Sequence, residues 1–219
     1  MNVPVTRIAR ARTVRLIPTA YWKPPVLRAL VEDDADLAVL ERLEGRTSRR
    51  LVRPAVTGLD LDRWGHSIIA AAFTYTRKGG NRFNGEERGA WYAGFDDRTA
   101  LGEVAFHRTR ELGFIGHYHD EAQYRALHAA FIGRFHDLRG VKPAPDALHP
   151  DPATGYPAGQ ALARELMAAG SRGLIYPSVR QRGGTCLVAF QPNVVQDVTP
   201  GATWRLAWTG TPAWTATAV

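Results

Sequence analysis

Residues 80–107 read GNRFNGEERGAWYAGFDDRTALGEVAFH, a stretch in which a turn, a strand and a helix follow one another. Glycine and asparagine at its start favour a turn. The aromatic run at 90–94 predicts a short strand. Asp97 or Thr99 can cap a helix that ends at Gly113. The stretch therefore carries polar residues at the junctions between three elements.

These polar residues are candidates for a functional site. Arg82 follows the glycine-rich turn, where small residues let an anionic ligand reach the backbone, so it is a candidate phosphate ligand. Glu103 lies among apolar neighbours and shares a helix face with His107. Gly102 costs a helix roughly 1 kcal/mol relative to alanine, which indicates close approach of another backbone or a ligand. The residues alone do not exclude the alternative that Arg82 is a solvated loop arginine and Glu103 a charged residue on the helix surface. Residues 176–180 end an apolar strand, another favoured place for functional side chains.

Outside this stretch, strands and helices follow without a regular βαβ order. Strands are expected over 13–17, 67–76, 131–138, 173–179 and 185–191, and after Thr199, where the tail then frays. Helices are expected over 34–44, the first half of 121–138, and 158–169. The mixture predicts an α+β fold with a mixed sheet core rather than a doubly wound sheet. Residues 1–65 are expected to form a partly helical N-terminal extension that packs on the core or on a partner protein, and residues 66–219 the core domain.

The chain is basic, with 28 lysines and arginines against 21 aspartates and glutamates and a net charge of +7 over 219 residues. More than half of the excess lies in residues 1–60, which hold 11 basic and 7 acidic side chains. A basic binding module that docks on nucleic acid is one reading of this arm. No recognition helix accompanies its arginines, so a disordered or partner-bound tail is favoured. Those arginines are Arg7, Arg10, Arg12 and Arg15.

Several classes of site are not expected. The single cysteine, Cys186, excludes an intramolecular disulfide and any multi-cysteine metal centre. His117 and His119 lack a third ligand with suitable spacing, so no metal is expected. The sequence has no phosphate-binding Walker loop, no dinucleotide-binding glycine motif and no nucleophile elbow. Without a membrane span or a secretory signal, a cytoplasmic location is expected.

Two blocks of the sequence resemble the RES domain family. The first block is the run Gly80-Asn81-Arg82-Phe83-Asn84, followed by Gly89, Tyr92, Ala93 and Ala100-Leu101-Gly102-Glu103. The second is residues 173–180, followed by Gly184, Cys186 and Phe190-Gln191-Pro192. The two blocks cover about residues 66–205. The segment Arg15-Leu16-Ile17-Pro18 is similar to the ParT-like branch of the family.

The resemblance implies a toxin of a type II toxin–antitoxin pair, whose partner is an Xre-like antitoxin. It implies a fold like that of ADP-ribosyltransferases of the diphtheria-toxin kind and an activity that consumes NAD, with no metal. ADP-ribose would be transferred to a protein, and in the ParT-like branch the implied target is phosphoribosyl pyrophosphate synthetase. Hydrolysis or phosphorolysis of free NAD is the alternative, and direct contact with nucleic acid or a membrane is not expected.

Three residues would carry the chemistry that the resemblance implies. Arg82 would bind the NAD phosphates, and Tyr92 would stack on nicotinamide or the adjoining ribose. Glu103 would bind that ribose and stabilise the oxocarbenium-like state as nicotinamide leaves. Four further residues would contact NAD: Asn84, His107, Ser178 and Arg180.

Overall fold

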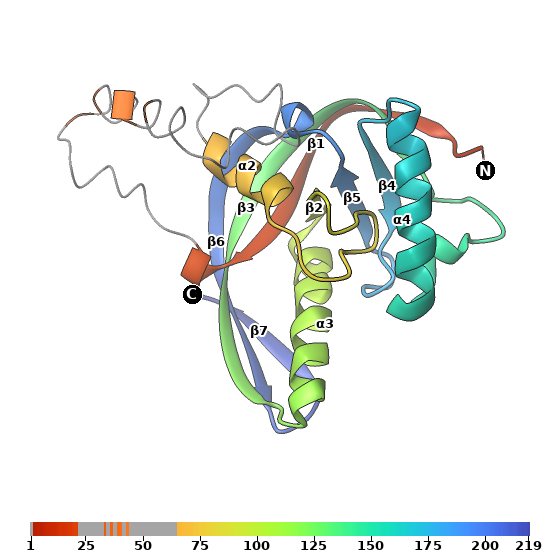
Figure 1. Cartoon of the computed structure of the whole chain (residues 1–219). Helices are drawn as coiled ribbons and strands as arrows, with labels where there is room; N and C mark the ends of the chain where they lie inside the picture. Colours follow the sequence, from red (N-terminus) through yellow and green to blue (C-terminus); the bar gives the residue numbers. More distant parts are fainter. Residues whose placement is uncertain (1, 22–32, 34–35, 37–38, 41–42, 44–64) are drawn as a thin grey trace.

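The computed structural model describes residues 2–21, 33, 36, 39–40, 43 and 65–219. Its strands form one mixed sheet in the order β1-β2-β5-β4-β3-β6-β7 (Figure 1). The strands are β1 (Val5–Pro18), β2 (Trp91–Gly94), β3 (His119–Asp137), β4 (Gly173–Pro177), β5 (Thr185–Ala189), β6 (Gln196–Thr209) and β7 (Trp214–Ala218). The α-helices with described bounds are α2 (His66–Thr74), α3 (Asp97–Ile115) and α4 (Pro152–Ala168). Short 3-10 turns lie at Thr19–Tyr21, Asp146–Leu148 and Pro192–Val194.

Strand β3 holds the sheet together. One edge pairs antiparallel with β1, and the opposite edge pairs antiparallel with β6. Its last two residues, His136 and Asp137, pair in parallel with β4. Because β1 also meets β2 at Val14 and Gly94, the pairings among β1, β2, β5, β4 and β3 close on themselves. The two strands β6 and β7 extend this arrangement from β3.

Each of the three helices packs on its own group of buried apolar side chains. Helix α2 packs on a cluster around Trp91, α4 on one around Phe83, and α3 on one around Trp208. Figure 1 shows the three helices at separate places along the sheet. Since burial of apolar surface is the main stabilising term in folding, these clusters fix where each helix lies.

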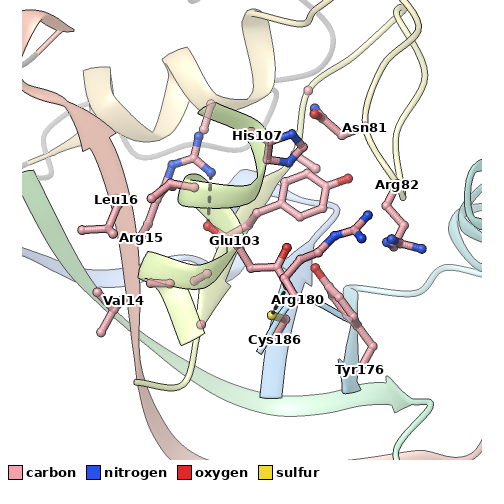
Figure 2. A pocket seen from close by; sticks show the side chains of 18 of the residues that line it. Val14, Arg15, Leu16, Asn81, Arg82, Glu103, His107, Tyr176, Arg180 and Cys186 are labelled. Atoms are coloured by element: carbon pink, nitrogen blue, oxygen red, sulfur yellow. Dashed lines mark hydrogen bonds between the residues drawn. The ribbon is translucent and has the colours of Figure 1, made fainter. Parts of the chain in front are cut away.

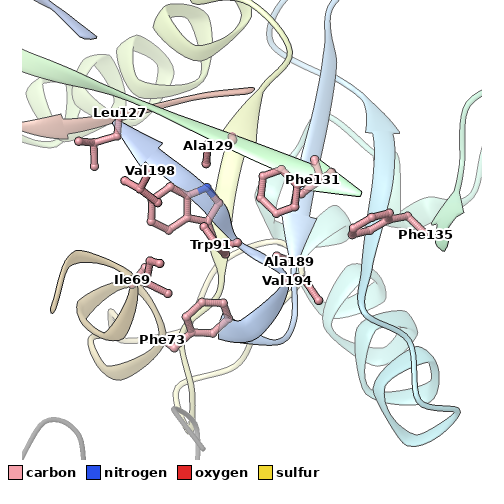
Figure 3. Close-up of a cluster of buried hydrophobic side chains, with 14 of the residues drawn as sticks. Ile69, Phe73, Trp91, Leu127, Ala129, Phe131, Phe135, Ala189, Val194 and Val198 are labelled. Atoms are coloured by element: carbon pink, nitrogen blue, oxygen red, sulfur yellow. The ribbon is translucent and has the colours of Figure 1, made fainter. Parts of the chain in front are cut away.

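The cluster under α2 is built around a fully buried tryptophan. Figure 3 shows Trp91 of β2 among side chains from α2 and β3, including Ile69 and Leu127. Phe131 and Phe135 of β3 meet edge to face, with ring centroids 6.0 Å apart. The indole Nε1 of Trp91 is buried and has no hydrogen-bond partner among the described residues. Trp91 therefore contributes through its apolar surface.

The strand expected over 67–76 is wrong, because these residues form helix α2. The buried side chains of Ile69 and Phe73 are four residues apart, as on one face of a helix. The alanines at 70–72 also favour helix. In a short run that is apolar at almost every position, the spacing of apolar residues does not distinguish a strand from a helix.

The helix expected in the first half of 121–138 is also wrong. The whole segment belongs to β3, and the strand expected over 131–138 is its second half. Residues 124–130 hydrogen-bond to β1 on one side and to β6 on the other. Pairing on both edges overrides the helix propensity of the alanines in this segment.

Both ends of the described chain are paired strands, which corrects two expectations. The basic arm is not a disordered tail, because Arg7, Arg12 and Arg15 pair with β3. The strand expected over 13–17 is confirmed as part of β1. At the other end the chain does not fray, since Trp214–Ala218 pairs antiparallel with β6.

Helix α3 begins and ends close to the expected places. Its cap is Asp96 rather than Asp97 or Thr99, and the Asp96 carboxylate accepts a hydrogen bond of 2.7 Å from the N–H of Thr99. It continues past Gly113 and ends at Ile115, and the residue that caps it, Gly116, has a left-handed φ of 70°. The helix expected over 158–169 starts earlier, at Pro152.

The predicted α+β class with a mixed sheet is confirmed, and the strands expected over 90–94, 173–179 and 185–191 are present as β2, β4 and β5. Most of the helix expected over 34–44 lies outside the described residues, and the domain boundary at residue 65 stays a prediction. None of the helices in the described parts of the chain is long and apolar enough to cross a membrane.

The cluster under α2 gives a test of what Trp91 contributes. We expect Trp91→Ala to lower the free energy of unfolding by about 3–5 kcal/mol, because it leaves a cavity in the core. Trp91→Phe should cost much less, since it keeps most of the apolar contact and removes a buried N–H without a described partner. Urea denaturation measures both values, and equal losses for the two variants would contradict this account of Trp91.

Candidate functional site

A cavity of about 220 Å³ lies where α3, β1, β2 and the turn after α2 come together. Five of the residues expected in the site line it, although they come from four separate segments of the chain: Arg82, Tyr92, Glu103, His107 and Arg180. Figure 2 shows Glu103 and Arg180 close to each other, with Arg82 and His107 on neighbouring walls. We call this cavity the catalytic cavity, after the catalytic roles that the family resemblance implies for its residues.

Arg82 is anchored against α4 as well as facing the catalytic cavity. Its Nη1 donates hydrogen bonds to the carbonyl oxygens of Ala147 at 2.8 Å and His149 at 2.9 Å. A Cβ atom at Gly155 would lie 2.5 Å from Nη1, and one at Gly159 would lie 2.2 Å from the Arg82 carbonyl oxygen. Nε and Nη2 carry three further N–H donors that suit an anionic ligand. Nη1 of Arg82 thus has a structural role, which the sequence did not indicate, while Nε and Nη2 are the groups left for a ligand.

The residues after Arg82 fix Tyr92. The Tyr92 hydroxyl donates to Oδ1 of Asn84 at 2.8 Å and accepts from the N–H of Phe83 at 2.9 Å. Burial raises the pKa of Tyr92, so the phenol is neutral at physiological pH. Asn84 does not line the cavity, and it also donates to the carbonyl oxygens of Gly85 and Arg88. Asn84 therefore positions Tyr92 in this structure.

Glu103 is held from the opposite side by the loop between β4 and β5. The Ser178 hydroxyl donates to Oε1 of Glu103 at 2.6 Å, and the thiol of Cys186 lies 3.6 Å from the same oxygen. The Ser178 oxygen also accepts from the N–H groups of Arg180 and Gln181, which fixes the loop. Burial and the neighbouring Glu103 carboxylate raise the pKa of Cys186 well above its usual range. The Ser178 hydroxyl and the Cys186 thiol both donate to Oε1, so Oε2 of Glu103 accepts a hydrogen bond from neither of them.

The cysteine is a site residue that sequence reasoning missed. It belongs to the second block of the family resemblance, but a lone cysteine carries no spacing signal that would assign it a role. Cys186 is buried in β5, opposite Gly94 of β2 and Tyr176 of β4. Pairing of strands from distant parts of the chain brings its thiol to Glu103.

Arg15 is the second residue that was missed, because no residue of the N-terminal extension was assigned a role in the site. It lines the catalytic cavity from β1, and its Nη1 donates to the carbonyl oxygen of Tyr92 at 3.2 Å. Its guanidinium carbon lies 5.0 Å from the centre of the Trp91 ring. Burial lowers the pKa of Arg15 to about 10, so the group is still charged at neutral pH. The signal that could have identified Arg15 was its position within the apolar strand expected over 13–17, since a charged residue in such a strand can enter a buried site.

Arg180 brings another cation into the cavity. Its guanidinium carbon lies 3.4 Å from the centre of the Phe106 ring. Its Nη2 is buried, and among the described residues it has no hydrogen-bond partner. Burial is the main cause that lowers the pKa of Arg180, and Arg82 adds to it. A buried N–H without a partner is well placed to donate to a ligand.

His107 is a neutral imidazole among arginines. Its Nδ1 lies 3.4 Å from Nη1 of Arg77, and because a guanidinium only donates, Nδ1 is the acceptor. Burial is the main cause that lowers the pKa of His107 to about 3, and the charges of Arg77, Arg180 and Arg110 contribute to this shift in that order. At neutral pH its Nε2 therefore carries the hydrogen and can donate.

Another segment does pack beside Gly102, but not as closely as expected from the sequence. A Cβ atom there would lie 3.4 Å from Cβ of Gln181 and 4.0 Å from the Arg180 carbonyl oxygen. These are ordinary contact distances, so the loop packs on α3 at this point but leaves room for a methyl group.

The two histidines considered for a metal, His117 and His119, are neighbours in the structure. The rings of His117 and His119 lie 5.4 Å apart between centroids. The described residues contain no group of three or more histidine, cysteine, aspartate or glutamate side chains that could hold a metal.

Comparison with known proteins identifies one family. A family model described as the RES domain matches residues 50–209, which is most of the chain and includes every site residue above except Arg15. A search of curated proteins gave no match.

The lowered pKa of His107 has a consequence for stability. Between about pH 3 and 6.5 the unfolded chain binds a proton at this residue that the folded chain does not, so stability falls as the pH is lowered through this range. We expect His107→Gln to lose less stability between pH 7 and pH 4.5 than the wild type does. Urea midpoints at the two pH values measure the difference. The matched variant His117→Gln, at an exposed histidine, should behave as the wild type, and an unchanged pH dependence in His107→Gln would refute the prediction.

Proposed function

Because the chain belongs to the RES domain family, which is known in toxin–antitoxin systems, we propose that it is a toxin that cleaves NAD at the nicotinamide–ribose bond and transfers ADP-ribose to a protein. The partner in the pair would be an Xre-like antitoxin. The fold of this chain would then correspond to that of ADP-ribosyltransferases of the diphtheria-toxin kind. Membership of the ParT-like branch is part of the same proposal and rests on residues 15–18.

The observation that carries the proposal is the placement of the Glu103 carboxylate. It is the one acid among the described residues that line the catalytic cavity, and arginines lie around it. Ser178 fixes one of its oxygens at 2.6 Å. An oriented carboxylate in a partly enclosed cavity stabilises positive charge that develops close to it.

Breaking the glycosidic bond develops charge of that kind. Nicotinamide leaves with the electron pair of the bond, and positive charge appears on the ribose carbon that it leaves. With the ribose beside Glu103, Oε2 faces this carbon while Ser178 and Cys186 hold Oε1. For comparison, loss of one preorganised donor that faces the developing negative charge of an oxyanion costs about 2.7–4 kcal/mol of transition-state stabilisation. Tyr92, whose hydroxyl is fixed by Phe83 and Asn84, offers its ring for stacking on nicotinamide or the ribose.

The phosphates of NAD would bind to the arginines of the cavity. Nε and Nη2 of Arg82, Nη2 of Arg180 and the charged Arg15 provide donors for an anion of this size. His107 adds a neutral N–H donor through Nε2. These donors would hold the dinucleotide while the bond to nicotinamide stretches.

The acceptor of ADP-ribose determines the final product. A protein nucleophile gives ADP-ribosylation, with phosphoribosyl pyrophosphate synthetase as the proposed target. Water gives ADP-ribose, and phosphate gives its 1-phosphate, which are the products of the alternative NAD-degrading activity. All three routes share the step at Glu103.

Release of nicotinamide from NAD by the purified protein tests the proposed activity. We expect Glu103→Gln to slow this release at least about 100-fold, because the amide keeps the shape but loses the charge. Arg82→Ala should slow it as well. The matched variant Glu165→Gln, at an exposed position on α4, should keep the wild-type rate. Chromatography measures nicotinamide and identifies the ribosyl product, and a wild-type rate in Glu103→Gln would reject the catalytic role of this residue.

Growth of a bacterial host tests the toxin assignment. Expression of the wild-type chain should arrest growth, while expression of Glu103→Gln at the same level should not. Co-expression of an Xre-like protein encoded beside this chain should restore growth. Arrest by Glu103→Gln at full strength would separate the toxicity from the proposed chemistry.

A further inference from the structure

A second cavity, of about 410 Å³, lies beside the catalytic cavity. It is bounded by the turn after α2, by the start of α4 and by one residue of α3. Its lining includes the cations Arg77, Lys78 and Arg110, together with Asp151 and Tyr156. We call it the basic cavity, and none of the roles proposed for the catalytic cavity uses Lys78 or Arg110.

The basic cavity has an excess of positive charge. None of its three cations forms an ion pair with a carboxylate of the described residues. Asp151 is the acid in its lining, and it is already engaged as the cap of α4, where it accepts from the N–H of Ala153 at 2.9 Å. A cavity of this composition attracts an anion.

The two cavities adjoin, since Arg77 and Tyr156 line both of them. Arg77 also contacts His107 of the catalytic cavity at 3.4 Å. The wall between the turn and α4 is fixed by Gln160, whose Nε2 donates to the carbonyl oxygens of Gly79 at 2.8 Å and Asn81 at 3.0 Å. A ligand that extends past Arg77 would therefore enter the basic cavity.

The size of the catalytic cavity limits how much of a dinucleotide it can hold. Pockets for drug-sized ligands have volumes of roughly 300–1,000 Å³, and a dinucleotide is larger than such a ligand. The catalytic cavity, at about 220 Å³, is below this range. If the nicotinamide end lies at Glu103, the other half of the molecule needs a second compartment with donors for phosphate.

We propose that the basic cavity binds the adenosine diphosphate half of the dinucleotide. The diphosphate would lie at the junction of the two cavities, with the arginines of the catalytic cavity on one side and Lys78 and Arg110 on the other, and Tyr156 would lie against the ribose or base. The proposal rests on the proposed function for the position of the nicotinamide half. Arg77, which lies between the two cavities, would contact the phosphate at the junction. The exposed side chains of Lys78 and Arg110 can be changed without disturbing a buried cluster.

Calorimetric titration of the full chain with ADP tests this proposal without any need for turnover. We expect ADP to bind the wild type and Glu103→Gln with the same affinity. The double variant Lys78→Ala/Arg110→Ala should bind ADP roughly tenfold or more weakly. Arg164→Ala is the matched control, because it removes a cation from an exposed position of α4 outside both cavities. Inorganic pyrophosphate, which lacks adenosine, should bind more weakly than ADP.

Three outcomes would overturn the proposal: no binding of ADP to the wild type, unchanged binding to the double variant, or pyrophosphate binding as tight as that of ADP. Nicotinamide release by the same preparations separates the two conclusions. If ADP binds as expected but NAD is not cleaved, the subsite stands and the proposed activity fails. If NAD is cleaved and the double variant keeps the wild-type KM, the activity stands and the subsite fails. A KM raised about tenfold or more with an unchanged kcat supports both.

Discussion

The site depends on the packing of Arg82 against α4. Gly155 and Gly159 are four residues apart on one face of this helix, and a side chain at either would overlap Arg82. Two carbonyl oxygens from the turn before the helix then fix the guanidinium. With Arg82 in place, the next residue enters the core as the fully buried Phe83. The close contact of Arg82 with Gly155 and Gly159 therefore fixes the position of α4 relative to the turn that contains Arg82.

Glu103 is positioned from the other end of the fold. Its α3 backbone is fixed by the cluster around Trp208, while its carboxylate is fixed by groups on β5 and the loop after β4. The Cys186 thiol and the Tyr92 phenol line the same cavity as Glu103, and burial is the main cause that raises the pKa of each. The field inside the cavity is therefore set by one carboxylate and several guanidinium groups. Such a field favours a ligand that carries both a negative group and a developing positive one.

The local sequence predicted the parts of the site that are close together along the chain. The turn, β2 and most of α3 follow from glycine, aromatic and capping residues within 80–113, and this stretch includes Arg82, Tyr92 and Glu103. Arg15 could not be found in this way, since its partner Tyr92 is 77 residues away. The four-residue spacing of Gly155 and Gly159 was visible, but nothing local says what packs there. The misread segments, α2 and the first half of β3, take their conformation from contacts with distant strands.

Strand β1 lies before the part of the chain that the family model matches, which starts at residue 50. A fragment cut at that point would lack the strand that covers β3 from Tyr124 to His136. The uncovered edge would present free N–H and C=O groups, which is the usual starting point for pairing between chains and for aggregation. The fragment would also lose Arg15 and with it one wall of the catalytic cavity. The sheet of the described structure thus begins well before the part of the chain that sequence similarity outlines.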